Sequence, residues 1–70
     1  MIKYDKLWKT MKNKGITKYA LHTKHNMSKS QLYRLKQNQF VSTNTIDRLC
    51  NILGCDVFEI MEHIPDDNIF

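Results

Sequence analysis

The sequence lacks several features that would place the chain in a membrane or outside the cell. It has no run of about 18 apolar residues, so we expect no membrane-spanning segment. The first ten residues lack the apolar core of a signal peptide, and two cysteines are too few for a disulfide scaffold. We therefore expect a cytoplasmic protein.

Catalytic and metal-binding patterns are also missing. The sequence has no glycine-rich phosphate loop, no paired carboxylates in an apolar setting and no credible Cys–His dyad, so we expect no enzymatic activity. Cys50 and Cys55 lie five positions apart with a helix stop between them, unlike the tight cysteine pairs of structural zinc sites. We expect no metal, cofactor or small-molecule ligand, although the conceivable ligands also include His22, His25 and His63.

Acidic residues are nearly absent from the first half of the chain. Residues 1–36 contain ten Lys or Arg and one acid, a balance of +9, whereas residues 37–70 contain one base and six acids, a balance of −5. This split predicts that one end of the folded domain faces a polyanion and that the opposite end has another role. The alternative is a solvated, lysine-rich surface. Nonspecific compaction of nucleic acid would instead favour basic charge over the whole surface.

Apolar residues recur with helical spacing and predict an all-α fold, a compact bundle of five short helices. Four helices are expected over about residues 4–14, 18–25, 29–37 and from a cap at Ser42 or Asn44 to about residue 53. The first helix carries an apolar stripe that consists of Tyr4, Leu7, Trp8 and Met11.

Turn and cap residues separate these helices. Thr17 and Ser28 are predicted N-caps, and Ser28 with Gln31 forms the capping-box pattern S-x-x-Q. Gly15 and Gly54 stand where helix stops are expected. Asn26 suits the left-handed backbone of a tight turn, and Phe40 and Val41 are expected to fold back onto the core.

A fifth short helix is predicted to open with Asp56 as its N-cap and Glu59 at its third position. Its core-facing residues would be Val57, Ile60, Met61 and Ile64, and Pro65 follows its end. No strand pattern or internal repeat is evident. We expect one domain over residues 1–65 and a short C-terminal tail over residues 66–70.

The predicted third helix has the pattern of a helix that reads DNA. If Leu32 and Leu35 face inward, helical geometry turns four other residues outward: Ser30, Tyr33, Arg34 and Gln37. Lys29 lies on the flank of this outward side, near the start of the helix. Arg34 can pair with guanine O6 and N7 in the major groove, and Gln31 or Gln37 with adenine. The alternative is an ordinary solvated helix face.

Two long segments together resemble a Cro/cI-type, or XRE-type, helix-turn-helix domain with the lambda-repressor-like fold. They are ITKYALHTKHNMSKSQLYRLKQNQ and VSTNTIDRLCNILGCDVFEIMEHIPD, and the likeness runs over about residues 4–65. It implies a sequence-specific regulator of transcription, expected to be a repressor, that binds double-stranded DNA in the bacterial cytosol or nucleoid.

The resemblance also implies roles for individual residues. The base-contacting positions of the family fall on Lys29, Ser30 and Arg34, with Gln31 as a further candidate. The phosphate-contacting positions fall on Thr17, Lys18, Lys36, Gln37, Asn38, Gln39, Thr43 and Asn44. The chain departs from the family pattern at two positions, with Asn26 in place of the usual glycine and His22 in place of a small alanine.

The sequence is also consistent with two partners other than DNA. The family habit, the small size and an apolar end of Ile64, Ile69 and Phe70 favour a homodimer. Alternatively, the chain is an antitoxin or protein-interaction module whose acidic second half binds a basic protein, with DNA binding secondary.

Overall fold

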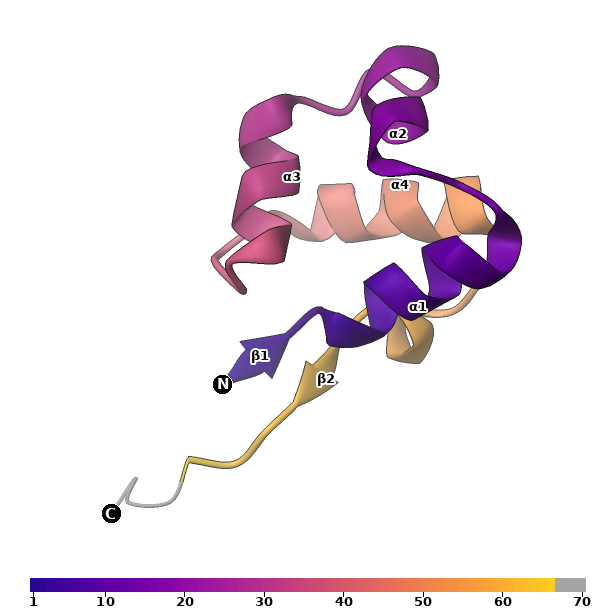
Figure 1. Cartoon of the computed structure of the whole chain (residues 1–70). Helices are drawn as coiled ribbons and strands as arrows, with labels where there is room; N and C mark the ends of the chain where they lie inside the picture. Colours follow the sequence, from indigo (N-terminus) through magenta and orange to yellow (C-terminus); the bar gives the residue numbers. More distant parts are fainter. Residues whose placement is uncertain (67–70) are drawn as a thin grey trace.

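Four α-helices make up most of the computed structural model, which describes residues 1–66 (Figure 1). The elements in chain order are β1 (Ile2–Lys3), α1 (Asp5–Lys14), α2 (Lys18–Lys24), α3 (Lys29–Lys36), α4 (Thr43–Leu53), the 3₁₀ turn η1 (Val57–Glu59) and β2 (Glu62–His63). Each of the four predicted helices is present, with ends that differ from the prediction by one residue at most.

The hydroxyl caps position three of the helix starts. The side-chain oxygens of Thr17, Ser28 and Ser42 accept hydrogen bonds from backbone N–H groups in the first turns of α2, α3 and α4. Of the two predicted caps for α4, Ser42 is therefore correct and Asn44 is wrong. Gly15 and Gly54 end α1 and α4 with φ angles of 69° and 62°, a left-handed backbone that glycine adopts without strain.

The core draws side chains from all four helices and from the segment after η1. Its fully buried apolar members are Leu7, Leu21, Met27, Leu35, Leu49 and Ile60. Burying one such side chain contributes about 1.5–3 kcal/mol, so a chain of this size depends on each of them. Trp8 packs against this cluster while half-buried, in agreement with the predicted stripe on α1.

The prediction of a fifth helix is wrong, and the fold is not purely helical. Asp56 and Glu59 do form the predicted capping box, but it opens only the single turn η1. The chain then extends into β2, which pairs antiparallel with β1, with Ile2 opposite His63 and Lys3 opposite Glu62. This pairing uses backbone groups that a continued helix would need.

Because the predicted fifth helix is replaced by one turn and a strand, only some of its expected core residues are buried. Ile60 is fully buried as predicted, whereas Val57 is 45% exposed instead of facing the core. The N–H of Ile64 donates to the carbonyl of Met1 at 2.8 Å, and the N-terminal ammonium contacts Asp66 at 3.4 Å. The first and last described segments therefore lie together, away from the turn between α2 and α3 (Figure 1).

The loop between α3 and α4 places only one of its two apolar residues on the core. Val41 packs against the core cluster, but Phe40 is 83% exposed, so the prediction that both fold inward is wrong. The core therefore takes the smaller of the two side chains and leaves the larger one in solvent. None of the helices in residues 1–66 has the length and hydrophobicity needed to span a bilayer.

Candidate nucleic-acid interface

The outward face of α3 is polar, cationic and open to solvent. Leu32 and Leu35 are buried on its inner side, and the residues on its opposite side are exposed. This exposed stripe consists of Lys29, Ser30, Tyr33, Arg34 and Gln37. An α-helix with such a stripe fits the major groove, where base edges present distinct donors and acceptors.

Gln31 is placed differently from the other three residues expected to contact bases. It is half-buried, and its side-chain oxygen is inaccessible and has no hydrogen-bond partner within residues 1–66. Its backbone N–H donates to the Ser28 hydroxyl at 3.2 Å, and Ser28 Oγ also lies 3.2 Å from Ser30 Oγ. Among the hydrogen bonds of the described residues, the Gln31 side chain does not return the bond, so only half of this capping box forms.

The turn before α3 is held from two sides. Asn26 has a φ of 56°, the left-handed conformation predicted for it. The ring Nδ1 of His22 lies 2.9 Å from the carbonyl oxygen of Met27 and must donate, because a carbonyl can only accept. Arg48 of α4 donates to the carbonyl of His25. At the position where the family has alanine, His22 therefore stabilises the turn, because its ring links α2 to the residue before the N-cap of α3.

Three lysines from different helices gather around one shallow pocket of about 390 Å³. Lys12 of α1, Lys18 of α2 and Lys36 of α3 line it together with Thr17 and the apolar side chains of Trp8, Met11 and Ile16. The ammonium of Lys18 lies 4.9 Å from the centre of the Trp8 ring, a cation–π contact that limits its motion. None of the acidic residues within residues 1–66 lines the pocket.

This pocket brings together three of the residues expected to contact phosphates: Thr17, Lys18 and Lys36. The Thr17 oxygen already accepts from the N–H of Ala20 at 3.0 Å, which leaves its O–H to donate elsewhere. Lys12 was not among the predicted contacts. In the sequence, Lys12 was only one of the many basic residues of the first half. Its place beside the pocket together with Lys36 arises from the packing of α1 against the helix-turn-helix.

The residues after α3 form a tight C-terminal cap. Asn38 is left-handed, with a φ of 56°, and Gln39 N–H donates to Arg34 O at 2.7 Å. This arrangement matches a Schellman motif with asparagine in the usual glycine position. The N–H groups of Gln37 and Asn38 also donate within the cap, so phosphate contacts from residues 37–39 depend on side chains.

The Asn38 side chain has a structural partner. Its Oδ1 accepts from the backbone N–H of Tyr4 at 2.8 Å and so connects the end of α3 to the start of α1. Thr43 and Asn44 occupy the first turn of α4, where backbone N–H groups have no intrahelical acceptors and can bind an anion. The expected phosphate contacts after α3 therefore divide into side chains of residues 37–39 and free backbone N–H groups in the first turn of α4.

Replacing Asn38 with alanine is expected to destabilise the fold by about 1–2 kcal/mol, because a cap is lost and alanine is strained at positive φ. Asn38→Gly is the matched control, since it loses the same hydrogen bond but tolerates this backbone. Urea denaturation followed by circular dichroism measures both. Equal stability of the alanine variant and the parent would contradict the assigned role.

Metal-binding clusters are not found in the described part of the chain: no group of three or more His, Cys, Asp or Glu side chains gathers there. The acids of the second half lie apart from the lysine pocket. Asp47, Asp56 and Glu59 line a different pocket, on α4 and the segment after it. The two pockets therefore differ in the sign of the charged residues that line them.

Taken with the exposed stripe of α3, this fold defines a helix-turn-helix DNA-binding domain, with double-stranded DNA as its partner. A family model described as a Cro/C1-type HTH DNA-binding domain matches residues 6–66, and the chain belongs to that family. The predicted family is thus confirmed.

One solved structure, the crystal structure of the transcriptional regulator VanUg, is similar over nearly the whole chain. The two share 32% sequence identity with a TM-score of 0.84, over 93% of this chain and 87% of the other. Among curated proteins, no match to the chain is found.

Proposed function

We propose that this protein is a sequence-specific transcriptional repressor that reads the major groove with α3. The observation that carries the proposal is the exposed stripe of α3, with Arg34 outward and Leu32 and Leu35 holding the helix from behind. Lys29, Ser30 and Arg34 are the proposed base-contacting residues. The similarity to a transcriptional regulator over 93% of the chain supports the regulatory role.

Phosphate contacts are proposed to orient α3 without reading sequence. The lysine pocket of Lys12, Lys18 and Lys36 supplies positive charge at the junction of α1, α2 and α3. The first turn of α4 and the exposed side chains of Gln37 and Gln39 complete the set. Contacts of this kind position the protein, whereas base-edge contacts give specificity.

A second subunit is proposed to read a half-site about one helical turn away, roughly 34 Å. The small size of the domain and the habit of the family support a homodimer. Of the three residues expected to form its apolar end, Ile64 is half-buried beside Met1, and Ile69 and Phe70 lie outside the described residues.

Selection of bound duplexes from a random pool at physiological salt is the direct test of this function. We expect a defined sequence, and a palindromic product would support the dimer as well. Recovery of unselected sequences would contradict the proposal, because Arg34 and its neighbours would then not read bases.

Removal of the Lys18 ammonium is expected to weaken binding to all duplexes alike. Lys18→Ala should reduce the slope of log affinity against log salt by about one, since one phosphate contact is lost. Lys14→Ala is the matched control. It removes the same charge from the end of α1, near Cys55, where no phosphate contact is proposed. Affinities measured by fluorescence anisotropy at several salt concentrations decide the point, and equal slopes for the two variants would contradict it.

A second candidate is an antitoxin or protein-interaction module that binds a basic protein. It is favoured by a pocket whose charged lining residues, within residues 1–66, are all acidic: Asp47, Asp56 and Glu59. A toxin-like reading frame next to the gene and a stable complex of the two products would support this function. Normal repression by the chain alone would leave DNA binding as the main function.

A further inference from the structure

Cys50 and Cys55 are brought together by the way α4 ends. Gly54 turns the chain with a φ of 62°, and the N–H of Cys55 then donates to the carbonyl of Cys50 at 3.1 Å. This is the longer hydrogen bond of a Schellman motif, in which the residue after the glycine packs against the residue five positions before it. In this chain both of those residues are cysteines.

The hydrogen bond also limits the separation of the two α-carbons. From Cα of Cys50 to its carbonyl oxygen, across the 3.1 Å bond and on to Cα of Cys55, the path spans at most about 7 Å. A bend at any point shortens it. A disulfide needs α-carbons about 4.4–6.8 Å apart, so the backbone already has a separation that a disulfide can use.

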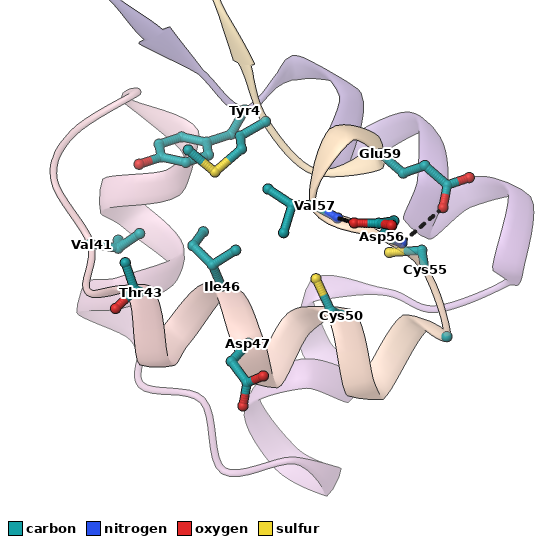
Figure 2. Close-up of a pocket in the computed structure, with 12 residues that line it drawn as sticks. Tyr4, Val41, Thr43, Ile46, Asp47, Cys50, Cys55, Asp56, Val57 and Glu59 are labelled. Carbon is teal, nitrogen blue, oxygen red and sulfur yellow. Dashed lines mark hydrogen bonds between the residues drawn. The ribbon is translucent and has the colours of Figure 1, made fainter.

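Both thiols are free and open onto a pocket of about 820 Å³ between α4, η1 and the start of α1 (Figure 2). Each cysteine is half-buried. Burial raises the pKa of both thiols, and the nearby carboxylate of Asp56 adds to this effect at Cys50. Asp47 acts in the same direction on Cys50 and Glu59 on Cys55, whereas Lys14 opposes the rise at Cys55.

We propose that Cys50 and Cys55 form a dithiol site that closes to an intramolecular disulfide by exchange with a low-molecular-weight disulfide. One thiol loses its proton and attacks a sulfur of the reagent, which forms a mixed disulfide and releases one thiolate. The second thiol then loses its proton and attacks the protein sulfur of the mixed disulfide, which releases the other half of the reagent. Two protein thiols are oxidised and one disulfide is reduced to two thiols.

The acidic lining of the pocket sets which reagents react. Asp47, Asp56 and Glu59 border the path to the sulfur atoms, so an anionic disulfide is repelled and a cationic one is attracted. Cystamine, which carries two ammonium groups, should therefore oxidise the site faster than glutathione disulfide. The site is separate from the exposed stripe of α3, so its oxidation does not depend on the proposed DNA-reading function.

The test is to treat the reduced full chain with cystamine or glutathione disulfide and follow its mass. We expect loss of two hydrogen atoms without a lasting adduct, and faster loss with cystamine. Cys50→Ser and Cys55→Ser should each retain one mixed disulfide, because no second thiol remains to displace it. Lasting adducts on both cysteines of the parent chain, or disulfide-linked dimers, would overturn the proposal.

A second measurement separates the folded geometry from mere closeness in sequence. In a glutathione buffer, the ratio of disulfide to dithiol should be roughly tenfold or more higher for the folded chain than for the chain in concentrated urea. An equal or lower ratio in the folded chain would show that the end of α4 does not favour the bond, and would overturn the proposal. Asp47→Asn is expected to narrow the difference in rate between cystamine and glutathione disulfide.

Discussion

Leu35→Ala is expected to lower the free energy of unfolding by about 2–5 kcal/mol, the usual cost of emptying a fully buried leucine site. Leu35 is 0% exposed and faces the core from the last turn of α3. Domains have roughly 0.05–0.15 kcal/mol of stability per residue, so for 70 residues this loss removes a large part of the total. Urea denaturation followed by circular dichroism at several temperatures measures it.

Tyr33→Ala is the matched control for that experiment. Tyr33 lies on the opposite side of the same helix and is 60% exposed, so its truncation should change stability by about 0.5 kcal/mol or less. Equal losses for the two variants would mean that the inner side of α3 is not what attaches the helix to the domain.

Arg34→Ala is expected to cost about 1–3 kcal/mol of binding to the selected operator and to relax preference at one base position. Arg34 is exposed on α3 and surrounded by polar neighbours, and its planar guanidinium can donate two parallel hydrogen bonds to guanine. Competition of operator variants, each with one base pair changed, measures both the loss and the position concerned.

Arg34→Lys separates base reading from charge. Lysine keeps the positive charge, so binding to nonspecific duplexes should remain near the parent value, but it lacks the rigid planar fork that donates two parallel hydrogen bonds. The operator preference should therefore fall almost as far as in the alanine variant. Equal losses on operator and nonspecific DNA in both variants would contradict the assignment of α3 as the reading helix.

Local chemistry explains why so much of the fold was predictable. The spacing of Leu7 and Met11, the hydroxyl caps and the glycine stops each act within a few residues, so they can be recognised without knowledge of the tertiary structure. The left-handed turn at Asn26 was predictable for the same reason. These signals placed α1 to α4 and the outward stripe of α3.

The errors fall where a distant segment competes with a local preference. The capping box at Asp56 favours a helix, and η1 does begin there, but β1 at the other end of the chain pairs with β2 and ends it. No pattern within residues 56–65 contains that information. Phe40 likewise lacks a partner on the core because Val41 takes the inward position.

By itself, the sequence determined the four helices, the family, the side of α3 that is exposed and the separation of charge between the two halves. Only the tertiary structure decided that Lys12, Lys18 and Lys36 share one pocket, that Arg48 of α4 holds the turn at His25, and that Asn38 connects the end of α3 to the start of α1. Helix starts and faces depend on hydrogen bonds and periodicity over a few residues. Which side chains from different elements meet depends on how the whole core packs, and that is set by contacts between residues far apart in the chain.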